Sequence, residues 1–196
     1  KIKIIEISNY TNFNEILDGR VKTLHPLIHA GLLANRRNKK HLREISKLKA
    51  NPIDLLVVNL YPFEKISSDP KNSDDKCIEN IDIGGPTMVR ASAKNYKNVV
   101  TLSSPEQYES FLNEIKEKGN IGLLTRRKLA RLAFENTAHY ESVISNWFNK
   151  DISEFCSKKS SIPLKKIKDL RYGENPHQSG SYYEFGDNKI TQINGK

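Results

Sequence analysis

The sequence has little cysteine, a single tryptophan and no long hydrophobic run. Cys77 and Cys156 are the only cysteines in 196 residues, and neither has a CxxC partner. Two isolated thiols argue against a disulfide scaffold and predict a reducing, cytoplasmic compartment. No apolar run approaches the ~20 residues that span a bilayer, so we expect no membrane partner. The N-terminal stretch has no small-residue cleavage site, and a signal peptide is therefore not expected.

Several motifs of covalent and metal catalysis are also missing. The sequence has no GxxxxGK[ST] phosphate loop, no GxSxG nucleophile elbow and no HExxH zinc motif. His25 and His29 have the i,i+4 spacing of a helical zinc site, but Pro26 lies between them and no third ligand is evident. We therefore expect no metal, with one histidine placed near a turn and the other packed. The polar residues that remain are mainly Lys, Arg, Tyr, Asn and Asp, which are the types expected to bind an anionic substrate.

Positive charge is abundant. The chain has 32 Lys and Arg against 23 Asp and Glu, a formal net charge of +9. Such a balance is compatible with nucleic-acid binding through phosphate neutralisation. However, the basic residues are scattered among acids, and the only dense runs are 36–40, 126–128 and 165–168. We expect no nucleic-acid partner, and a basic α/β module that binds nucleic acid stays as an alternative.

Hydrophobic patterning predicts alternating strands and helices. Residues 104–119 carry helix-end signals: Ser104 as cap, Pro105 at the first position, Gln107 completing a capping box and Gly119 at the end. The alternation predicts an α/β layered domain with a mainly parallel sheet. The expected strands are 1–7, 53–61 and 98–102, and the other expected helices are 41–50, one that begins at Pro86, and 125–148.

Composition changes after Phe148. Residues 151–168 are rich in Ser and Lys and have no sustained period, which predicts a linker. Residues 169–196 are Gly-rich and aromatic, as expected for the beginning of a second domain. The predicted organisation is a first domain at 1–150, a linker at 151–168 and a second domain that starts at 169.

Three segments are candidates for a ligand site, because ligands of open α/β sheets bind at the carboxyl ends of the strands. They are GRVKTLHP (19–26), VVNLYPF (57–63) and NIDIGGPTMVRASAKN (80–95). In the third, the backbone N–H groups near Gly84 and Gly85 are candidates to hold an anion or a developing oxyanion. Each segment also has a plainer interpretation, as a charged turn or a solvated helix face.

Taken together, these segments resemble one family. GRVKTLHP, VVNLYPF, ENIDIGGPTMVRASAKN, AFENTAHYE and LRYGENPHQ occur in this order in the bifunctional purine-biosynthesis enzymes. Those enzymes join IMP cyclohydrolase to phosphoribosylaminoimidazolecarboxamide formyltransferase. The resemblance implies a methylglyoxal-synthase-like (MGS-like) α/β domain at 1–150, N-terminally incomplete, followed by the start of a cytidine-deaminase-like formyltransferase domain.

The resemblance also implies about forty further N-terminal residues, with a Lys-Thr-Gly turn and a Ser-Thr-Gly-Gly-Thr loop that hold the nucleotide phosphate. Neither motif occurs in this sequence. An inactive fragment or a pseudoenzyme is therefore a second alternative to an active enzyme.

Residue roles follow from the same resemblance. Lys94 is implied as proton donor and acceptor in cyclisation, and we expect Lys22 and Tyr61 to stabilise the developing oxyanion. In the second domain, Arg171, Tyr172 and His177 are implied to bind the aminoimidazole carboxamide ribotide. The implied nucleotide-binding residues are Arg20, Val21, Lys22, Thr23, Val58, Asn59, Asp82, Ile83 and Gly84.

The implied reaction closes the purine ring of a formylated ribotide to give IMP, with loss of water. No cofactor is expected for this cyclisation. In the full-length family protein, 10-formyltetrahydrofolate is the implied cosubstrate of formyl transfer. The implied partners are purine ribotides and a second copy of the chain in a homodimer.

Overall fold

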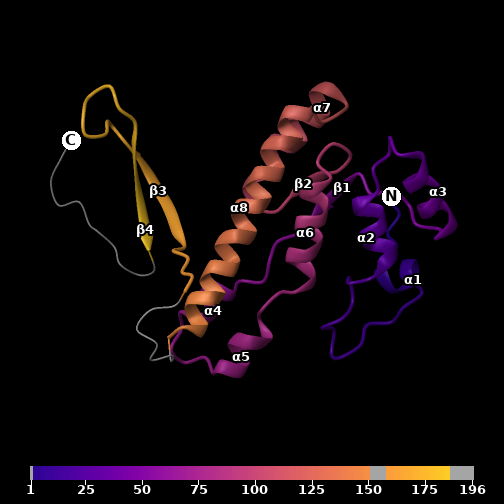
Figure 1. The fold of residues 1–196 in the computed structure, drawn as a ribbon, viewed down its shortest axis with the longest axis horizontal. Helices are drawn as coiled ribbons and strands as arrows, with labels where there is room; N and C mark the ends of the chain where they lie inside the picture. Colours follow the sequence, from indigo (N-terminus) through magenta and orange to yellow (C-terminus); the bar gives the residue numbers. More distant parts are fainter. Residues whose placement is uncertain (1, 151–157, 186–196) are drawn as a thin grey trace. The chain divides into compact units, whose positions relative to one another are not determined.

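The computed structural model of the chain describes residues 2–150 and 158–185. It divides into two compact units, Lys1–Ala138 and His139–Lys196 (Figure 1). The predicted domain boundaries stay predictions. Among the described residues, none of the helices combines the length and the hydropathy that a membrane span requires.

A short parallel sheet lies at the centre of the first unit. Strand β1 (Leu55–Val57) pairs with β2 (Val100–Leu102), with Leu56 opposite Thr101. The Val58 N–H extends the ladder by donating to the Leu102 carbonyl at 3.0 Å. All three residues of β2 are buried, as expected for a strand covered on both faces. The prediction of a parallel α/β layered fold is confirmed, with strands shorter than the apolar runs that contain them.

Helices surround this sheet. The 3-10 helix η1 spans Pro105–Gln107. The α-helices of the first unit are α1 (Ile7–Thr11), α2 (Pro26–Leu33), α3 (Lys39–Lys47), α4 (Phe63–Ser67), α5 (Asp74–Glu79), α6 (Gly84–Lys94) and α7 (Tyr108–Lys118), and α8 (Leu123–Phe148) runs on past Ala138.

The prediction of a strand at residues 1–7 is wrong. Residues 2–6 have no regular structure, and helix α1 begins at Ile7. Ile2 and Ile4 are exposed. An alternating run forms a stable strand only where a neighbouring strand satisfies its backbone groups, and the described part of the chain offers it none.

Helices α2 and α6 run side by side in the same direction (Figure 1). Thr23, just before α2, contacts Gly84 at the start of α6. At the other end, the Asn95 side-chain amide donates to the carbonyls of Leu32 and Ala34 at 2.8 and 3.0 Å. The apolar core beneath the two helices includes Leu32 and Val89, both fully buried. This pairing places the two helix N-termini together.

The signals at residues 104–119 are only partly confirmed. Gly119 ends α7 in the left-handed conformation, with φ of 64°. Ser104, however, makes no side-chain capping bond. Instead, the Gln107 side-chain oxygen accepts from the Ser103 N–H at 2.8 Å. Because η1 tightens the first turn, the glutamine reaches the backbone one residue earlier than a regular capping box requires.

The second unit contains an antiparallel hairpin. Strand β3 (Leu164–Leu170) pairs with β4 (Gly180–Phe185), with an irregularity between Lys166 and Lys168. Strand β3 therefore begins inside the range predicted as a linker, and residues 151–157 of that range lie outside the described residues.

Candidate functional site

Two loops meet at the start of α6. A Cβ atom added to Gly84 would lie 2.6 Å from the Thr23 hydroxyl oxygen, closer than a van der Waals contact allows. The glycine is therefore what lets the 20–23 loop touch α6. We call Arg20, Lys22, Thr23, Asp82 and Gly84 the loop cluster. Two of the three segments selected from the sequence meet in it.

Asp82 caps α6 from within this cluster. Its Oδ1 accepts from the Gly85 N–H at 2.7 Å, and a Cβ at Gly85 would overlap the carboxylate. A carboxylate at a helix N-terminus is favourable because it faces the positive end of the helix dipole. The sequence analysis named the Gly85 N–H as a candidate donor to an oxyanion. In the structure this N–H is already bonded to Asp82.

Both cations of the cluster are held by carboxylates. Arg20 Nη2 lies 2.5 Å from Glu79 Oε2, and Lys22 Nζ lies 2.8 Å from Glu15 Oε2. The hydrogen bond and charge of Glu79 raise the pKa of Arg20, and those of Glu15 raise the pKa of Lys22. The Arg20 and Lys22 side chains remain 65% and 52% exposed. They are oriented by their partners and still accessible to a ligand.

The segment after β1 adds further predicted residues. The hydroxyl of Tyr108 donates to Asn59 Oδ1 at 3.0 Å, which orients the asparagine at the carboxyl end of the strand. Tyr61 is 56% exposed and is the smallest of the electrostatic influences that raise the pKa of Lys22. Val58 is half-buried. Tyr61 therefore lies within electrostatic range of the loop cluster.

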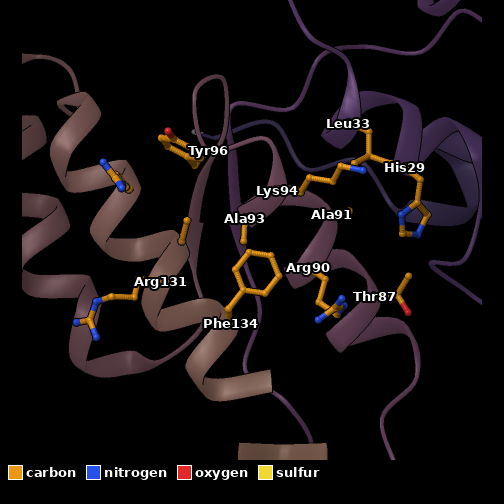
Figure 2. Close-up of a pocket in the computed structure, with 12 residues that line it drawn as sticks. His29, Leu33, Thr87, Arg90, Ala91, Ala93, Lys94, Tyr96, Arg131 and Phe134 are labelled. Carbon is orange, nitrogen blue, oxygen red and sulfur yellow. The ribbon is translucent and has the colours of Figure 1, made fainter. Parts of the chain in front are cut away.

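Lys94 lies elsewhere. It is the last residue of α6, about 15 Å along the helix from Gly84. It lines a groove of about 670 Å³ formed by residues of α2, α6 and α8, which we call the α2–α6–α8 groove. Figure 2 shows its ammonium pointing toward Leu33, at the C-terminal end of α2. Within one chain, the structure does not bring Lys94 to the loop cluster.

The groove contains residues that the sequence analysis did not assign to a site. Arg90, Arg127 and Arg131 line it together with Lys94, and no carboxylate is among its lining residues. The Arg90 guanidinium lies over the Phe134 ring, 5.5 Å from its centroid. The i,i+4 spacing of Arg90 with Lys94, and of Arg127 with Arg131, was the signal that could have revealed this basic face.

The two histidines of the opening segment differ in role. His25 Nδ1 accepts from the Leu27 N–H at 3.2 Å and caps α2. His29 lines the groove, its Nε2 is buried without a hydrogen-bond partner, and burial lowers its pKa. The prediction of one positional and one packed histidine agrees with these contacts. Among the described residues, no three His, Cys, Asp or Glu side chains are grouped as metal ligands.

The second-unit residues lie in the hairpin. Arg171 and Tyr172 directly follow β3, and His177 lies in the connection to β4. The Gly173 N–H donates to the Gln178 carbonyl at 2.7 Å and closes this connection. All three predicted side chains are exposed.

The fold and the loop cluster together define a class: an α/β domain with a short parallel sheet, in which the 20–23 loop meets the N-terminus of helix α6. Residues 1–87 match the family profile of the MGS-like domain. Residues 92–196 match the profile of the AICARFT/IMPCHase bienzyme. The chain belongs to the AICARFT/IMPCHase bienzyme family.

Relatives and a solved structure agree with this assignment. The chain is 46% identical over 202 residues to the bifunctional purine biosynthesis protein PurH of Acetivibrio thermocellus, covering all of this chain and 39% of that protein. It is 51% identical over 185 residues to PurH of Persephonella marina, covering 93% of this chain and 36% of that protein. The crystal structure of ForH superposes with a TM-score of 0.62 at 31% identity, covering 73% of this chain and 74% of ForH. The chain thus spans less than two fifths of the length of these PurH relatives.

Proposed function

We propose that this chain contributes the ring-closing half of a bifunctional purine-biosynthesis enzyme. The reaction converts formylated aminoimidazole carboxamide ribotide to IMP with loss of water. The observation that carries the proposal is the contact between Thr23 and Gly84. It places the 20–23 loop against the Asp82–Gly84 loop, where residues from separate segments can surround one ribotide.

Binding is assigned to the exposed parts of the loops. Arg20 and Thr23 place the ribose-phosphate end, because a guanidinium and a hydroxyl are suited to phosphate oxygens. Asn59 and Asp82 orient the carboxamide and the ring. Val21, Val58, Ile83 and Gly84 complete the nucleotide-binding set.

The chemistry is assigned to three side chains. The carboxamide nitrogen attacks the formyl carbon, and negative charge develops on the former formyl oxygen. Lys22 and Tyr61 stabilise this oxyanion, a role typically worth ~3 kcal/mol for one preorganised donor. Lys94 transfers protons at the nitrogen. None of these steps requires a cofactor.

The second unit is assigned to the other half-reaction. In the whole protein, Arg171, Tyr172 and His177 bind the aminoimidazole carboxamide ribotide, and 10-formyltetrahydrofolate donates the formyl group. We further propose a cytoplasmic homodimer that acts on small-molecule ribotides. An inactive copy is the competing proposal, and it predicts nucleotide binding without turnover.

The test is ring closure by single variants, made in the longest natural polypeptide that contains this sequence. Lys22→Ala and Lys94→Ala should each lower kcat about 10²-fold, as expected for loss of a transition-state donor or a proton-transfer group. Lys97→Ala is the matched control, because Lys97 is an exposed lysine that lies just beyond α6. If both site variants keep kcat within a few-fold of the parent, the residue assignment is wrong.

Loss of turnover in the parent protein itself would favour the inactive copy. That outcome is recognised when IMP still binds, as measured by calorimetry, while formylated ribotide is not converted.

A further inference from the structure

The segment that carries Lys22 forms a small antiparallel hairpin. Ile16 and Val21 form its bridge, and their backbone N–H groups donate to each other's carbonyls at 3.2 and 3.3 Å. The residues next to this bridge, Glu15 and Lys22, therefore lie opposite each other. The Lys22 ammonium is 2.8 Å from Glu15 Oε2. The hairpin thus holds an acid and a base together as a cross-strand pair.

The turn of this hairpin is strained. Leu17 and Asp18 both have φ of 54°, and Gly19 follows with φ of 88°. Glycine adopts such angles without steric cost, whereas two successive non-glycine residues in this region are uncommon. Leu17 is 66% exposed, so burial of its side chain does not offset the strain. Strained turns of this kind cluster at functional sites, and the residues that follow this one include Arg20 and Lys22.

The ion pair between Glu15 and Lys22 contributes little to stability. The two side chains are 54% and 52% exposed, and water screens the attraction of exposed charges. What the pair does fix is the direction and the charge of the ammonium. In the described part of the chain, Glu15 is the carboxylate at salt-bridge distance from Lys22, whereas Glu6 and Tyr61 influence its pKa less. An ammonium has three N–H donors, so a bond to Glu15 leaves two for a ligand.

We propose that Glu15 is a positioning residue for ring closure and that it acts through Lys22. It aims the ammonium and keeps it protonated, so that a cation is in place where negative charge develops on the former formyl oxygen. The inference rests on the proposed function, because it assumes that Lys22 stabilises this oxyanion. A donor that is already oriented needs no reorganisation in the transition state. Glu15 itself is assigned no contact with the ribotide.

The first test uses single variants in the longest natural polypeptide that contains this sequence. Glu15→Ala should lower kcat for ring closure about tenfold and change KM less than about twofold, because the misdirected ammonium is needed mainly in the transition state. Glu15→Asp keeps the carboxylate and should recover most of the loss. Glu44→Ala is the matched control, since Glu44 forms an exposed ion pair with Lys40 on α3, and it should keep the parent kcat.

A double variant separates positioning from a merely structural role. Lys22→Ala alone should lower kcat about 10²-fold. If Glu15 acts only through Lys22, adding Glu15→Ala to that variant should cause no further loss. A structural role would instead multiply the two losses to about 10³-fold, and that outcome overturns the inference. Equal kcat of Glu15→Ala and Glu44→Ala would overturn it as well.

The pH dependence of kcat gives an independent readout. Glu15→Gln keeps the shape of the side chain and removes its charge. Because the hydrogen bond and charge of Glu15 raise the pKa of Lys22, the loss of turnover at alkaline pH should begin at a lower pH in this variant than in the parent. Glu6 and Tyr61, the other groups that act on Lys22, are the same in both proteins. An unchanged alkaline limb would contradict the inference. If Lys22→Ala itself keeps its turnover, it is the proposed function that fails.

Discussion

Gly84 is the residue at which the 20–23 loop packs against the start of α6. Gly84→Ala should destabilise the first unit by ~1–2 kcal/mol, because the new methyl group would lie 2.6 Å from the Thr23 hydroxyl oxygen. The measurement is the urea midpoint of the variant, together with its affinity for IMP, which should fall as the 20–23 loop is displaced.

Thr23→Ala provides the control for this prediction. It removes the crowding oxygen, and the Thr23 Cβ lies at an ordinary 3.9 Å from the position that the new methyl group would take. On this background, Gly84→Ala should be neutral or slightly stabilising, since alanine loses less backbone entropy than glycine. An equal penalty on both backgrounds would show that Thr23 is not the obstacle.

At the scale of single residues, the role of a side chain was easier to predict from the sequence than the residue that it contacts. The sequence predicted that one of His25 and His29 lies near a turn and that the other is packed; in the structure His25 makes a capping bond and His29 Nε2 is buried. It gave no indication that Arg20 would meet Glu79, which is 59 positions away. Such pairs depend on how segments pack, and local composition contains no information on packing.

Between elements, Glu114 connects α7 to the start of α8. Its carboxylate accepts from the Gly122 N–H at 3.0 Å and from the Thr125 hydroxyl at 2.8 Å. These bonds lower the pKa of Glu114 below 4.5. Because the unfolded chain then binds the proton more tightly, the stabilisation is present above about pH 4.5 and is lost as pH falls through the lowered value.

Glu114→Gln should therefore lower the urea midpoint at pH 6, and the difference from the parent should shrink as pH falls below 4.5. Glu117→Gln, an exposed change on the same helix, serves as the control. A difference that persists unchanged at low pH would mean that the charge of Glu114 is not what supports the α8 terminus.

Asn95 connects the C-terminal ends of α2 and α6 through hydrogen bonds of its side chain. Its amide donates to two carbonyls, those of Leu32 and Ala34. Asn95→Asp keeps the shape and removes the donor, so we expect a loss of ~1–3 kcal/mol in the free energy of unfolding. Asn113→Asp, a surface change on α7, should have little effect. If the two variants unfold at the same urea concentration, the amide does not hold the helices together.

Elements with strong local signals could be predicted, and those that depend on a distant partner could not. The expected helix at 125–148 is found as α8 (Leu123–Phe148), because its apolar spacing is sustained over many turns. The expected strand at 1–7 is not formed by residues 2–7, although the run is rich in isoleucine. A helix satisfies its own backbone, whereas a strand needs a neighbour. For the same reason, β1 and β2 are shorter than their apolar runs.

At the scale of the whole molecule, the order of the motifs was enough to predict the family. It was not enough to predict how the residues of those motifs lie relative to one another in space. The motifs containing Lys22 and Lys94 are collinear with the family, and this suggested one site. The structure instead separates them along α6. The order of motifs along the chain does not say how far a residue of one segment lies from a loop of another, and it therefore gave no signal for the distance between Lys94 and the loop cluster.

The net charge of +9 leads to the last prediction, which concerns nucleic acid. The cations are dispersed: four line the groove, and the basic run at 165–168 lies in the second unit. Arg20, Lys22, Arg36 and Lys166 are held by carboxylates. Few phosphates could thus be neutralised at once. We expect a plot of log K against log salt for duplex DNA with a slope shallower than about −3.

Fluorescence anisotropy of a labelled duplex, titrated between about 50 and 200 mM salt, measures that slope directly. A nucleic-acid-binding module would give a slope of about −6 or steeper. That result would require the scattered lysines and arginines to act on one continuous backbone, and ring closure would then no longer account for the positive charge. A shallow slope together with saturable binding of IMP leaves the anionic ribotide as the ligand for which these cations are placed.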